Sequence, residues 1–190
     1  MFILGRKVKI SSKNHTMKKF YISALLMIVM LAAGGYAQAQ SEIRMQSVFL
    51  YNFTRLIAWP ADYQSGDFIV AVYGNSPMLA EVEDMASTKR AGNQPIVAKN
   101  FRSVEEISRC HIIYVPSNQS RRIEEIVAAL KANRINALVV TDARNAIRSG
   151  ATINFTIIDG RQRFEMSQEN ARAMGLNPGG EITRLAILAD

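Results

Sequence analysis

The stretch from Ala151 to Leu176, ATINFTIIDGRQRFEMSQENARAMGL, constrains the fold more than any other, because it predicts a β-hairpin followed directly by a capped helix. The residues from Thr152 to Ile158 alternate with the period of a strand that buries one face. Asp159-Gly160 then suits a two-residue hairpin turn, because such turns need left-handed backbone. The return strand, Gln162 to Met166, places Phe164 on one face and Arg163 and Glu165 on the other. We therefore expect a hairpin with a distinct inside and outside.

Both end signals of a helix follow the hairpin. Ser167 suits an N-cap, the predicted helix runs from Gln168 to Met174, and Gly175 stands where a left-handed C-terminal residue is wanted. Capping already accounts for Ser167, which is therefore a poor candidate nucleophile. The stretch as a whole is a signature of fold and carries no obvious chemistry.

The N-terminus has the three-part pattern of a secretory signal peptide. From Met17 the chain has two lysines, an apolar run from Tyr21 to Ala33, and small residues ending at Ala39. The apolar run is short for a membrane span, so we expect cleavage after Ala39 and export to the periplasm. An uncleaved membrane anchor is the alternative. Residues 17–39 are thus the predicted signal peptide, residues 1–16 an upstream extension, and residues 40–190 the mature domain.

Most of the basic charge belongs to this leader. The full chain has 23 Lys and Arg against 16 Asp and Glu, a net charge of +7, and the first forty residues hold six of the bases and none of the acids. The mature part therefore carries 17 bases and 16 acids, a net charge of +1. Its charge gives no argument for a nucleic-acid partner, and we predict none.

Cys110 is the only cysteine, so the exported protein has no internal disulfide and depends on its core. A buried free thiol is the favoured interpretation, and a reactive or intermolecular thiol is the alternative. His111 is the only histidine after Ala39 and opens an apolar strand. We expect it to be a hydrogen-bonded structural residue.

The mature chain begins with one long helix. Apolar residues recur at helical spacing from Ile43 to Ile57, and Trp59-Pro60 closes the segment. Because this helix is apolar over more than one stripe, it is either covered by the sheet or shared with a second copy. A homodimer is therefore one open arrangement.

Strands then alternate with helices. The predicted strands are residues 68–73, 95–99, 111–115 and 136–141. The predicted helices are a segment to about Thr88 with Ser76 as cap and Pro77 at its first position, residues 103–108, and a segment opened by Ser117 or Ser120. Residues 144–148 are a predicted helical turn. Such alternation predicts βαβ units, hence a parallel sheet with helices on both sides. The expected fold is a single three-layer α/β domain, Rossmann/flavodoxin-like, with an antiparallel C-terminal hairpin at the sheet edge and a long N-terminal helix.

Four segments in this order resemble one known family. They are Gln46–Pro60, Cys110–Pro116, Ala137–Asp142 and Ser149–Leu176, and they resemble the YfiR/HmsC-like periplasmic proteins over essentially the whole mature chain. The resemblance implies an exported regulator that holds an inner-membrane diguanylate cyclase inactive, lowers cyclic diguanylate and restrains biofilm formation. Those members are tied by disulfide pairs, whereas this chain has Cys110 alone, so control by thiol oxidation does not carry over.

An enzyme should show convergent acids, bases and nucleophiles, and the sequence offers none. No His, Cys or Asp cluster has the spacing of metal ligands, so we predict no catalytic residues, no metal and no cofactor. Gly74-Asn75-Ser76-Pro77 exposes backbone N–H groups at a helix start, where an anion could bind weakly, although capping is the simpler explanation. Asp142 ends a strand where open α/β sheets place ligands, which is also ordinary turn chemistry.

Binding residues are easier to nominate. Asn52, Arg55 and Trp59 stand at i, i+3 and i+7, so we expect them on one side of the first helix as a recognition surface. The alternative is that Trp59 belongs to the core and Arg55 is a solvated rim charge. Arg161 and Arg163 in the hairpin are a second candidate pair, with solvated edge-strand charges as the alternative.

Two functional hypotheses follow. In the first, a non-enzymatic periplasmic protein represses an inner-membrane signalling protein through its long helix and the hairpin end. In the second, the protein senses a small molecule at the carboxyl ends of the parallel strands, near Gly74, Pro116 and Asp142. The two are compatible, because a ligand can control a repressor. A hydrolase-like activity stays open as a third alternative only because catalytic groups can assemble from distant positions.

Overall fold

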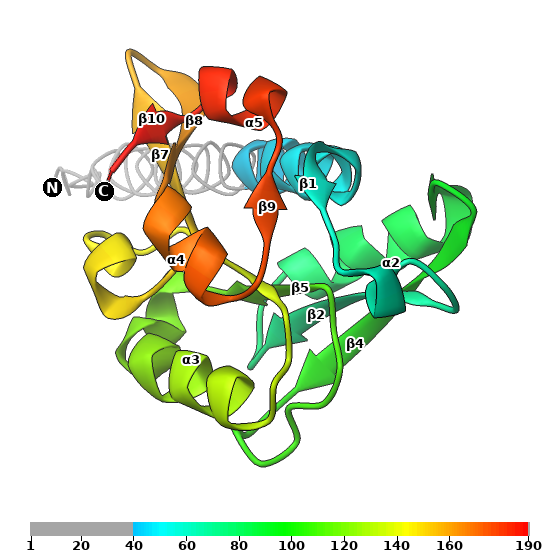
Figure 1. Ribbon diagram of the computed structural model, residues 1–190. Coiled ribbons are helices and arrows are strands. Elements are labelled where there is room, and N and C mark those ends of the chain that lie inside the picture. The colour runs from blue at the N-terminus through cyan, green and yellow to red at the C-terminus, as the bar shows by residue number, and fades with distance from the viewer. Residues whose placement is uncertain (1–39, 190) are drawn as a thin grey trace, which may run out of the picture. The chain divides into compact units, whose positions relative to one another are not determined.

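The computed structural model describes residues 40–189 (Figure 1). By the contacts of its backbone, the segment Glu42–Asp190 forms one compact unit. The predicted upstream extension, residues 1–16, and the predicted signal peptide, residues 17–39, lie outside the described residues. Among the described helices, none combines the length and the hydrophobicity that crossing a bilayer requires.

The fold is mixed α/β, built on a curled, mostly parallel sheet in the order β10-β8-β7-β6-β5-β2-β4-β3. Its strands are β2 (Phe68–Tyr73), β3 (Arg90–Ala91), β4 (Gln94–Phe101), β5 (Ile112–Val115), β6 (Leu138–Thr141), β7 (Ile153–Ile158), β8 (Arg161–Met166) and β10 (Ile187–Leu188). The neighbours from β4 through β2, β5 and β6 to β7 pair in parallel, and β7 with β8 is antiparallel. The predicted α/β class is thus confirmed, and its Rossmann/flavodoxin-like detail stays a prediction.

The sequence suggested that the hairpin forms the edge of the sheet. In the structure it does not, because a further strand lies outside it. The short strand β10 pairs in parallel with the end of β8, where Leu188 lies beside Met166. A second, two-stranded sheet joins β1 (Ile57–Ala58) to β9 (Asn177–Pro178). The segment after α4 therefore returns along two earlier elements, which local sequence patterns could not indicate.

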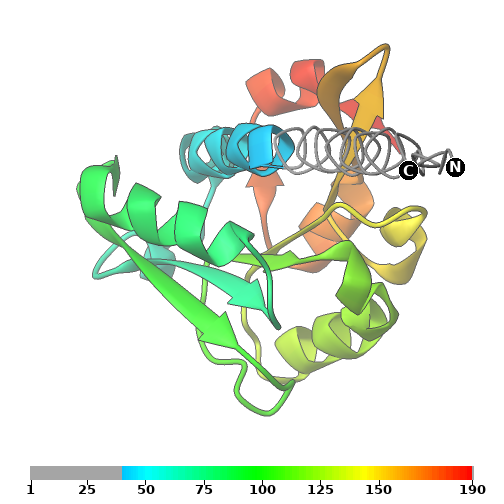
Figure 2. The same ribbon diagram turned by 180° about the vertical axis from the view of Figure 1, so that it is seen from behind.

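Helices cover both faces of the parallel strands. The described helices are the N-terminal helix (residues 40–56), α2 (Met78–Thr88), α3 (Ile123–Ala132), α4 (Gln168–Ala173) and α5 (Gly180–Leu185), with 3-10 turns η1 (Ala61–Tyr63), η2 (Ser117–Arg122) and η3 (Ala146–Ser149). The chain steps from β2 to β4 in one direction and from β5 to β6 in the other. Right-handed crossovers then place α2 and α3 on opposite faces, as Figures 1 and 2 show.

The predicted helix over residues 103–108 is absent. That segment makes one turn, in which the Ile107 N–H donates to the Val104 carbonyl at 3.2 Å. The Glu106 carboxylate accepts from the Arg102 N–H at 2.7 Å instead of supporting a further turn. At the start of α2 the Ser76 hydroxyl accepts from the Met78 N–H at 3.2 Å, as expected of a capping serine, but the helix begins at Met78 and not at the predicted Pro77.

The hairpin itself forms as expected. Asp159 and Gly160 adopt positive φ values of 51° and 70° at the turn, and the Ser167 hydroxyl accepts the Asn170 N–H at 3.0 Å as the cap of α4. Gly175 ends the helix with φ 70°. The expectation of one buried face is wrong, however, because burial changes along the strand.

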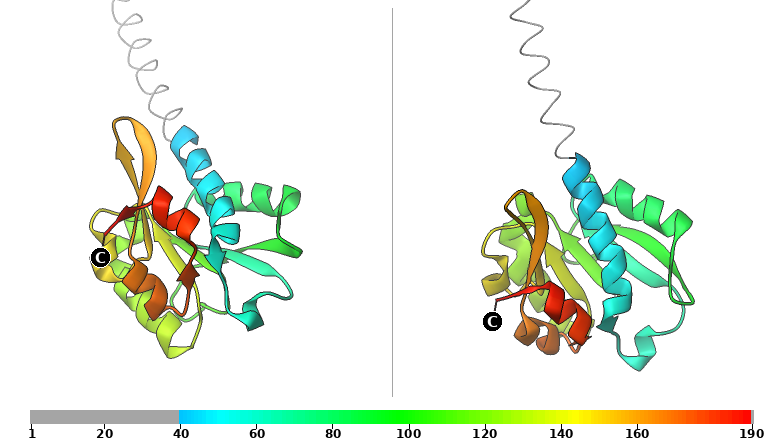
Figure 3. Two further views of the ribbon diagram at one scale, coloured as in Figure 1. Left: turned by 45° about the horizontal axis from the view of Figure 1, so that its top comes forward. Right: turned by 90° about the horizontal axis from the view of Figure 1, so that it is seen from above.

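At the base of β7, Ile153 and Asn154 are both buried although they face opposite ways. At the tip, Ile157 and Ile158 are 51% and 44% exposed. The tip projects beyond the rest of the sheet (Figure 3), so neither of its faces is covered.

The N-terminal helix packs on the sheet. Phe53 stacks on Phe155 of β7 with ring centroids 6.2 Å apart, and the hydroxyl of Tyr114 on β5 donates to the Gln46 side chain at 3.2 Å. Toward α2, Arg44 lies 3.9 Å from the Glu81 carboxylate. The sheet therefore covers the main apolar stripe, while Met45 and Val48 remain about half exposed.

Candidate functional site

A groove of about 400 Å³ runs between the N-terminal helix, strand β8 and α5, and we call it the helix–hairpin groove. It is lined by Phe49, Asn52, Phe53, Arg55, Leu56, Phe164, Glu181 and Leu185. Two of the residues nominated from sequence, Asn52 and Arg55, are among them. The structure thus brings the helix and the hairpin end together at one concave surface.

The floor of the groove is aromatic and tightly packed. Phe164 of β8 meets Phe53 edge to face at 5.3 Å between ring centroids, and Phe49 edge to face at 5.7 Å. Edge-to-face packing suits the charge distribution of aromatic rings, and both Phe53 and Phe164 are 1% exposed. The floor is therefore a rigid apolar surface, because its rings are held by one another and by the sheet.

Charges of opposite sign stand on the two walls. On the helix, the Arg55 guanidinium donates to the Asn52 side-chain oxygen at 3.2 Å and lies 5.2 Å from the centre of the Tyr51 ring. On the other wall, Glu181 comes from the first turn of α5, and Leu185 follows one turn later with half its surface exposed. The groove can thus receive an apolar group that is flanked by polar or charged groups.

Trp59 does not belong to this surface, which corrects the expected i, i+3, i+7 arrangement. Residues 57–58 form β1, so the helix ends before Trp59. The indole is 8% exposed, packs edge to face on Phe68 and His111 at 5.3 and 5.4 Å, and its N–H points to the Thr54 carbonyl at 3.4 Å. Trp59 is a core residue.

Arg161 and Arg163 lie on the other face of the hairpin. Phe164 pairs with Phe155 and faces the helix, whereas Arg163 pairs with Thr156 and points the opposite way, since side chains alternate along a strand. The two arginines line a separate hollow of about 330 Å³ with Ile158 and Asp159. They do not share a surface with Asn52 and Arg55.

At the carboxyl ends of the strands, the groups nominated to bind a ligand instead form contacts within the chain. The Asp142 carboxylate accepts from the Ser117 N–H at 2.6 Å. Burial and the nearby Asp142 carboxylate raise the pKa of Tyr114. A Cβ added at Gly74 would meet the Gln119 side chain at 3.2 Å, so this end of β2 is already covered. Nothing in this geometry singles out the carboxyl edge as a ligand site.

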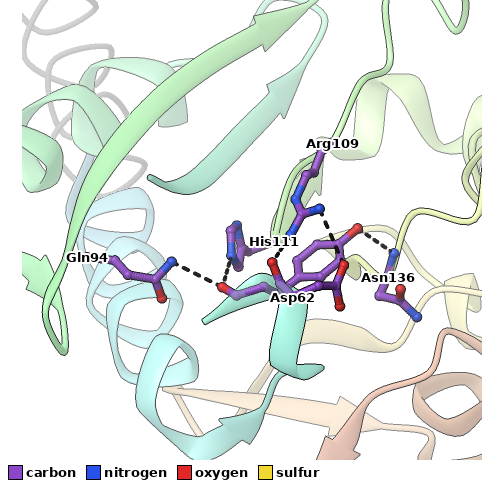
Figure 4. A network of polar contacts seen from close by, with 6 residues as sticks. Asp62, Gln94, Arg109, His111 and Asn136 are labelled. Atoms are coloured by element: carbon purple, nitrogen blue, oxygen red, sulfur yellow. Dashed lines mark hydrogen bonds and ion pairs between the residues drawn. The ribbon is translucent and has the colours of Figure 1, made fainter. Parts of the chain in front are cut away.

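A polar network at the amino ends of the strands was not anticipated (Figure 4). Its centre is Tyr63 of η1, which is 2% exposed and bonds through both its carbonyl and its hydroxyl. His111 is part of this network and is buried and hydrogen-bonded, as the sequence suggested. Tyr63 gave no sequence signal, because one tyrosine in a polar connection is unremarkable until its partners are known.

Cys110 is a buried free thiol, as predicted. Burial raises the pKa of its thiol to about 12, so the reactive thiolate is scarce at neutral pH. Across residues 40–189, no three His, Cys, Asp or Glu side chains gather as a metal site would require.

A family model described as YfiR/HmsC-like matches residues 43–187. The chain belongs to the YfiR/HmsC-like family. The match includes every element that lines the helix–hairpin groove and extends through the hairpin to β10. A search of curated proteins found no match.

Proposed function

We propose that the mature protein is a periplasmic, non-enzymatic regulator that binds and represses a membrane signalling protein. Membership of the YfiR/HmsC-like family supports this role, since it suggests a periplasmic regulator of cyclic diguanylate signalling. The partner is then the periplasmic part of an inner-membrane diguanylate cyclase. Repression of that cyclase lowers cyclic diguanylate and restrains biofilm formation.

The observation that carries the binding proposal is the helix–hairpin groove. Binding energy concentrates where aromatic and arginine side chains surround a pocket that excludes water. Here a fixed aromatic floor meets Arg55, which forms no ion pair with an acidic residue of the described chain. A partner can therefore supply both an apolar side chain for the floor and a carboxylate for Arg55.

Arg55 is partly preorganised for that contact. Asn52 and Tyr51 already hold the guanidinium, so less side-chain entropy is lost when a carboxylate binds it. An arginine at the centre of an interface contributes about 2 kcal/mol or more, which is roughly 30-fold in affinity. Reversal of its charge should therefore weaken repression strongly.

The test replaces the chromosomal gene with variants and measures cellular cyclic diguanylate. Deletion should raise cyclic diguanylate, and Arg55→Glu combined with Leu185→Asp should raise it to the same level. Both side chains are exposed, so thermal unfolding of the purified variant should match the original protein. Arg163→Glu is the matched control, because this exposed arginine lies on the opposite face of the hairpin.

Full repression by the groove variant, at normal protein level, would show that the groove is not the contact. Release by Arg163→Glu alone would instead assign the contact to the arginine face of the hairpin. An unchanged cyclic diguanylate level after deletion would refute the regulatory role itself.

A further inference from the structure

Tyr63 of η1 bonds to groups at the amino ends of three strands, β4, β5 and β6, whose residues Gln94, His111 and Asn136 are labelled in Figure 4. The Tyr63 carbonyl accepts from the Gln94 side chain of β4 at 3.1 Å and from the His111 ring, just before β5, at 2.9 Å. The Tyr63 hydroxyl accepts from the Asn136 N–H, just before β6, at 3.0 Å. One residue thus links the amino ends of these three strands.

The geometry around His111 admits only the neutral ring. A carbonyl can only accept, so Nε2 carries the proton that it donates to Tyr63. A backbone N–H can only donate, so Nδ1 must be the bare acceptor for the Ile69 N–H at 3.0 Å. Both nitrogens are used, and the side chain has no further site for a proton.

The groups that face the ring offer no compensation for a positive charge. From η1 come Tyr63 and Asp62, and from the segment before β5 comes Arg109. Arg109 lies 4.0 Å from the centre of the Tyr63 ring and 3.3 Å from the Asp62 carboxylate, so that carboxylate is already paired with Arg109. β2 presents the uncharged Phe68, stacked at 4.1 Å, and the segment before η1 presents the uncharged Trp59 at 5.4 Å.

A second proton on Nδ1 would place two N–H donors against each other at 3.0 Å, inside a site that is 1% exposed. We propose that His111 is a proton-sensitive latch, which holds η1 against the sheet while neutral and releases it when protonated. The release is local, because the helices α2 and α3 bury their own apolar faces on the sheet and make no bond to the latch.

The sign follows from the two states of the ring. Burial, together with the neighbouring Arg109 charge, lowers the pKa of His111 in the closed state below its ordinary value of 6.5. In the released state the ring meets water and returns toward its ordinary pKa, so the released state binds the proton more tightly. The latch is therefore fully stabilising above about pH 6.5 and weakens as the pH falls from there toward the lowered value.

Release of η1 would loosen the connection to one wall of the helix–hairpin groove. η1 begins three residues after the end of β1, which pairs Ile57 with Pro178, and the N-terminal helix ends immediately before β1. The latch nevertheless acts whether or not that groove binds a partner, so the test below needs no partner.

The protein carries its own probe, because Trp59 is its only tryptophan and lies against the ring of His111. Purified protein is titrated from pH 8 to pH 4, with tryptophan fluorescence, far-UV circular dichroism and amide hydrogen exchange recorded together. We expect a fluorescence transition with its midpoint below pH 6.5, before any loss of helical signal. Exchange of the Ile69 and Asn136 amides should accelerate over the same range, since Ile69 donates to the His111 ring and Asn136 donates to the Tyr63 hydroxyl of η1.

Two variants test whether protonation of His111 causes the fluorescence transition. His111→Gln should abolish it, because glutamine can donate and accept but does not titrate in this range. Arg109→Gln, at an exposed position, should move the midpoint to higher pH, because a repelling charge is removed. Arg163→Gln, on the distant hairpin, is the control and should leave the midpoint unchanged.

The latch is refuted if fluorescence and helical signal change together, or if the transition persists in His111→Gln. Should His111→Gln fail to fold, Arg109→Gln decides alone, and an unmoved midpoint refutes the proposal.

Discussion

Gly175→Ala and Gly160→Ala form a matched pair that isolates one contact between α4 and the strand β6. Both glycines have φ 70°, so an alanine at either position has the same backbone strain, about 1–2 kcal/mol. Around Gly160 there is nothing within 4 Å of an added Cβ. At Gly175 the Cβ would lie 2.1 Å from the Asn136 side-chain nitrogen, which is too short for a non-bonded contact, so the neighbouring atoms must shift.

Asn136 can yield only by giving up a bond. Its amide donates to the Met174 carbonyl at 2.9 Å and thereby fixes the end of α4 beside the start of β6. Loss of that bond, with the polar groups left imperfectly paired, adds about 1–3 kcal/mol to the strain at Gly175. We therefore expect Gly175→Ala to cost about 2–5 kcal/mol and Gly160→Ala about 1–2 kcal/mol.

Urea unfolding followed by far-UV circular dichroism measures both variants. With a slope of about 2 kcal/mol per M, the two midpoints should differ by roughly 0.5–1.5 M, Gly175→Ala being the less stable. Equal midpoints would refute the reasoning, because backbone strain alone would then explain both losses. Restoring stability to Gly175→Ala with Asn136→Ala, which removes the clashing amide, would identify the contact directly.

Three further outcomes follow from packing, capping and burial. Phe164→Ala should lower the free energy of unfolding in urea by about 3–5 kcal/mol, because a fully buried ring and its contacts are lost. Ile157→Ala at the exposed tip should lower it far less. Similar losses in the two variants would show that the aromatic floor is not a packed core. Ser167→Ala should cost about 1 kcal/mol through the lost cap of α4, and an unchanged midpoint would mean that the cap contributes nothing. Cys110, whose pKa is raised to about 12 by burial, should react with iodoacetamide at pH 8 only after unfolding, and rapid labelling of the folded protein would contradict its burial.

Local patterns predicted the elements whose determinants are local. The hairpin turn at Asp159-Gly160 and the cap at Ser167 depend on neighbours within three residues, and both formed as expected. The apolar run Phe68–Tyr73 likewise predicted a strand covered on both faces. Segment 103–108 was predicted wrongly although its bonds are also local, because the Glu106 carboxylate accepts from the Arg102 N–H and the backbone forms a single turn instead of a helix.

Trp59 shows where periodicity is misleading. The heptad-like spacing from Asn52 continues past the real end of the helix, which is set by the pairing of Ile57 with Pro178, over a hundred residues later. A window of helical length contains no trace of that partner. For the same reason the sequence did not predict α5. This helix follows Gly179, begins at Gly180 and brings Glu181 to the groove.

The alternation of side chains along β8 separates the two candidate binding sets, Asn52 with Arg55 and Arg161 with Arg163. Phe164 and, two residues earlier, Gln162 face the N-terminal helix, whereas Arg161 and Arg163 face away, so a partner seated in the groove cannot contact both sets with one flat surface. By the same alternation, Ile157 shares the groove face and Ile158 the arginine face. A partner that extends from the groove along this face of the hairpin would therefore cover Ile157 and leave Ile158 exposed, and a partner that needs both must surround the projecting tip.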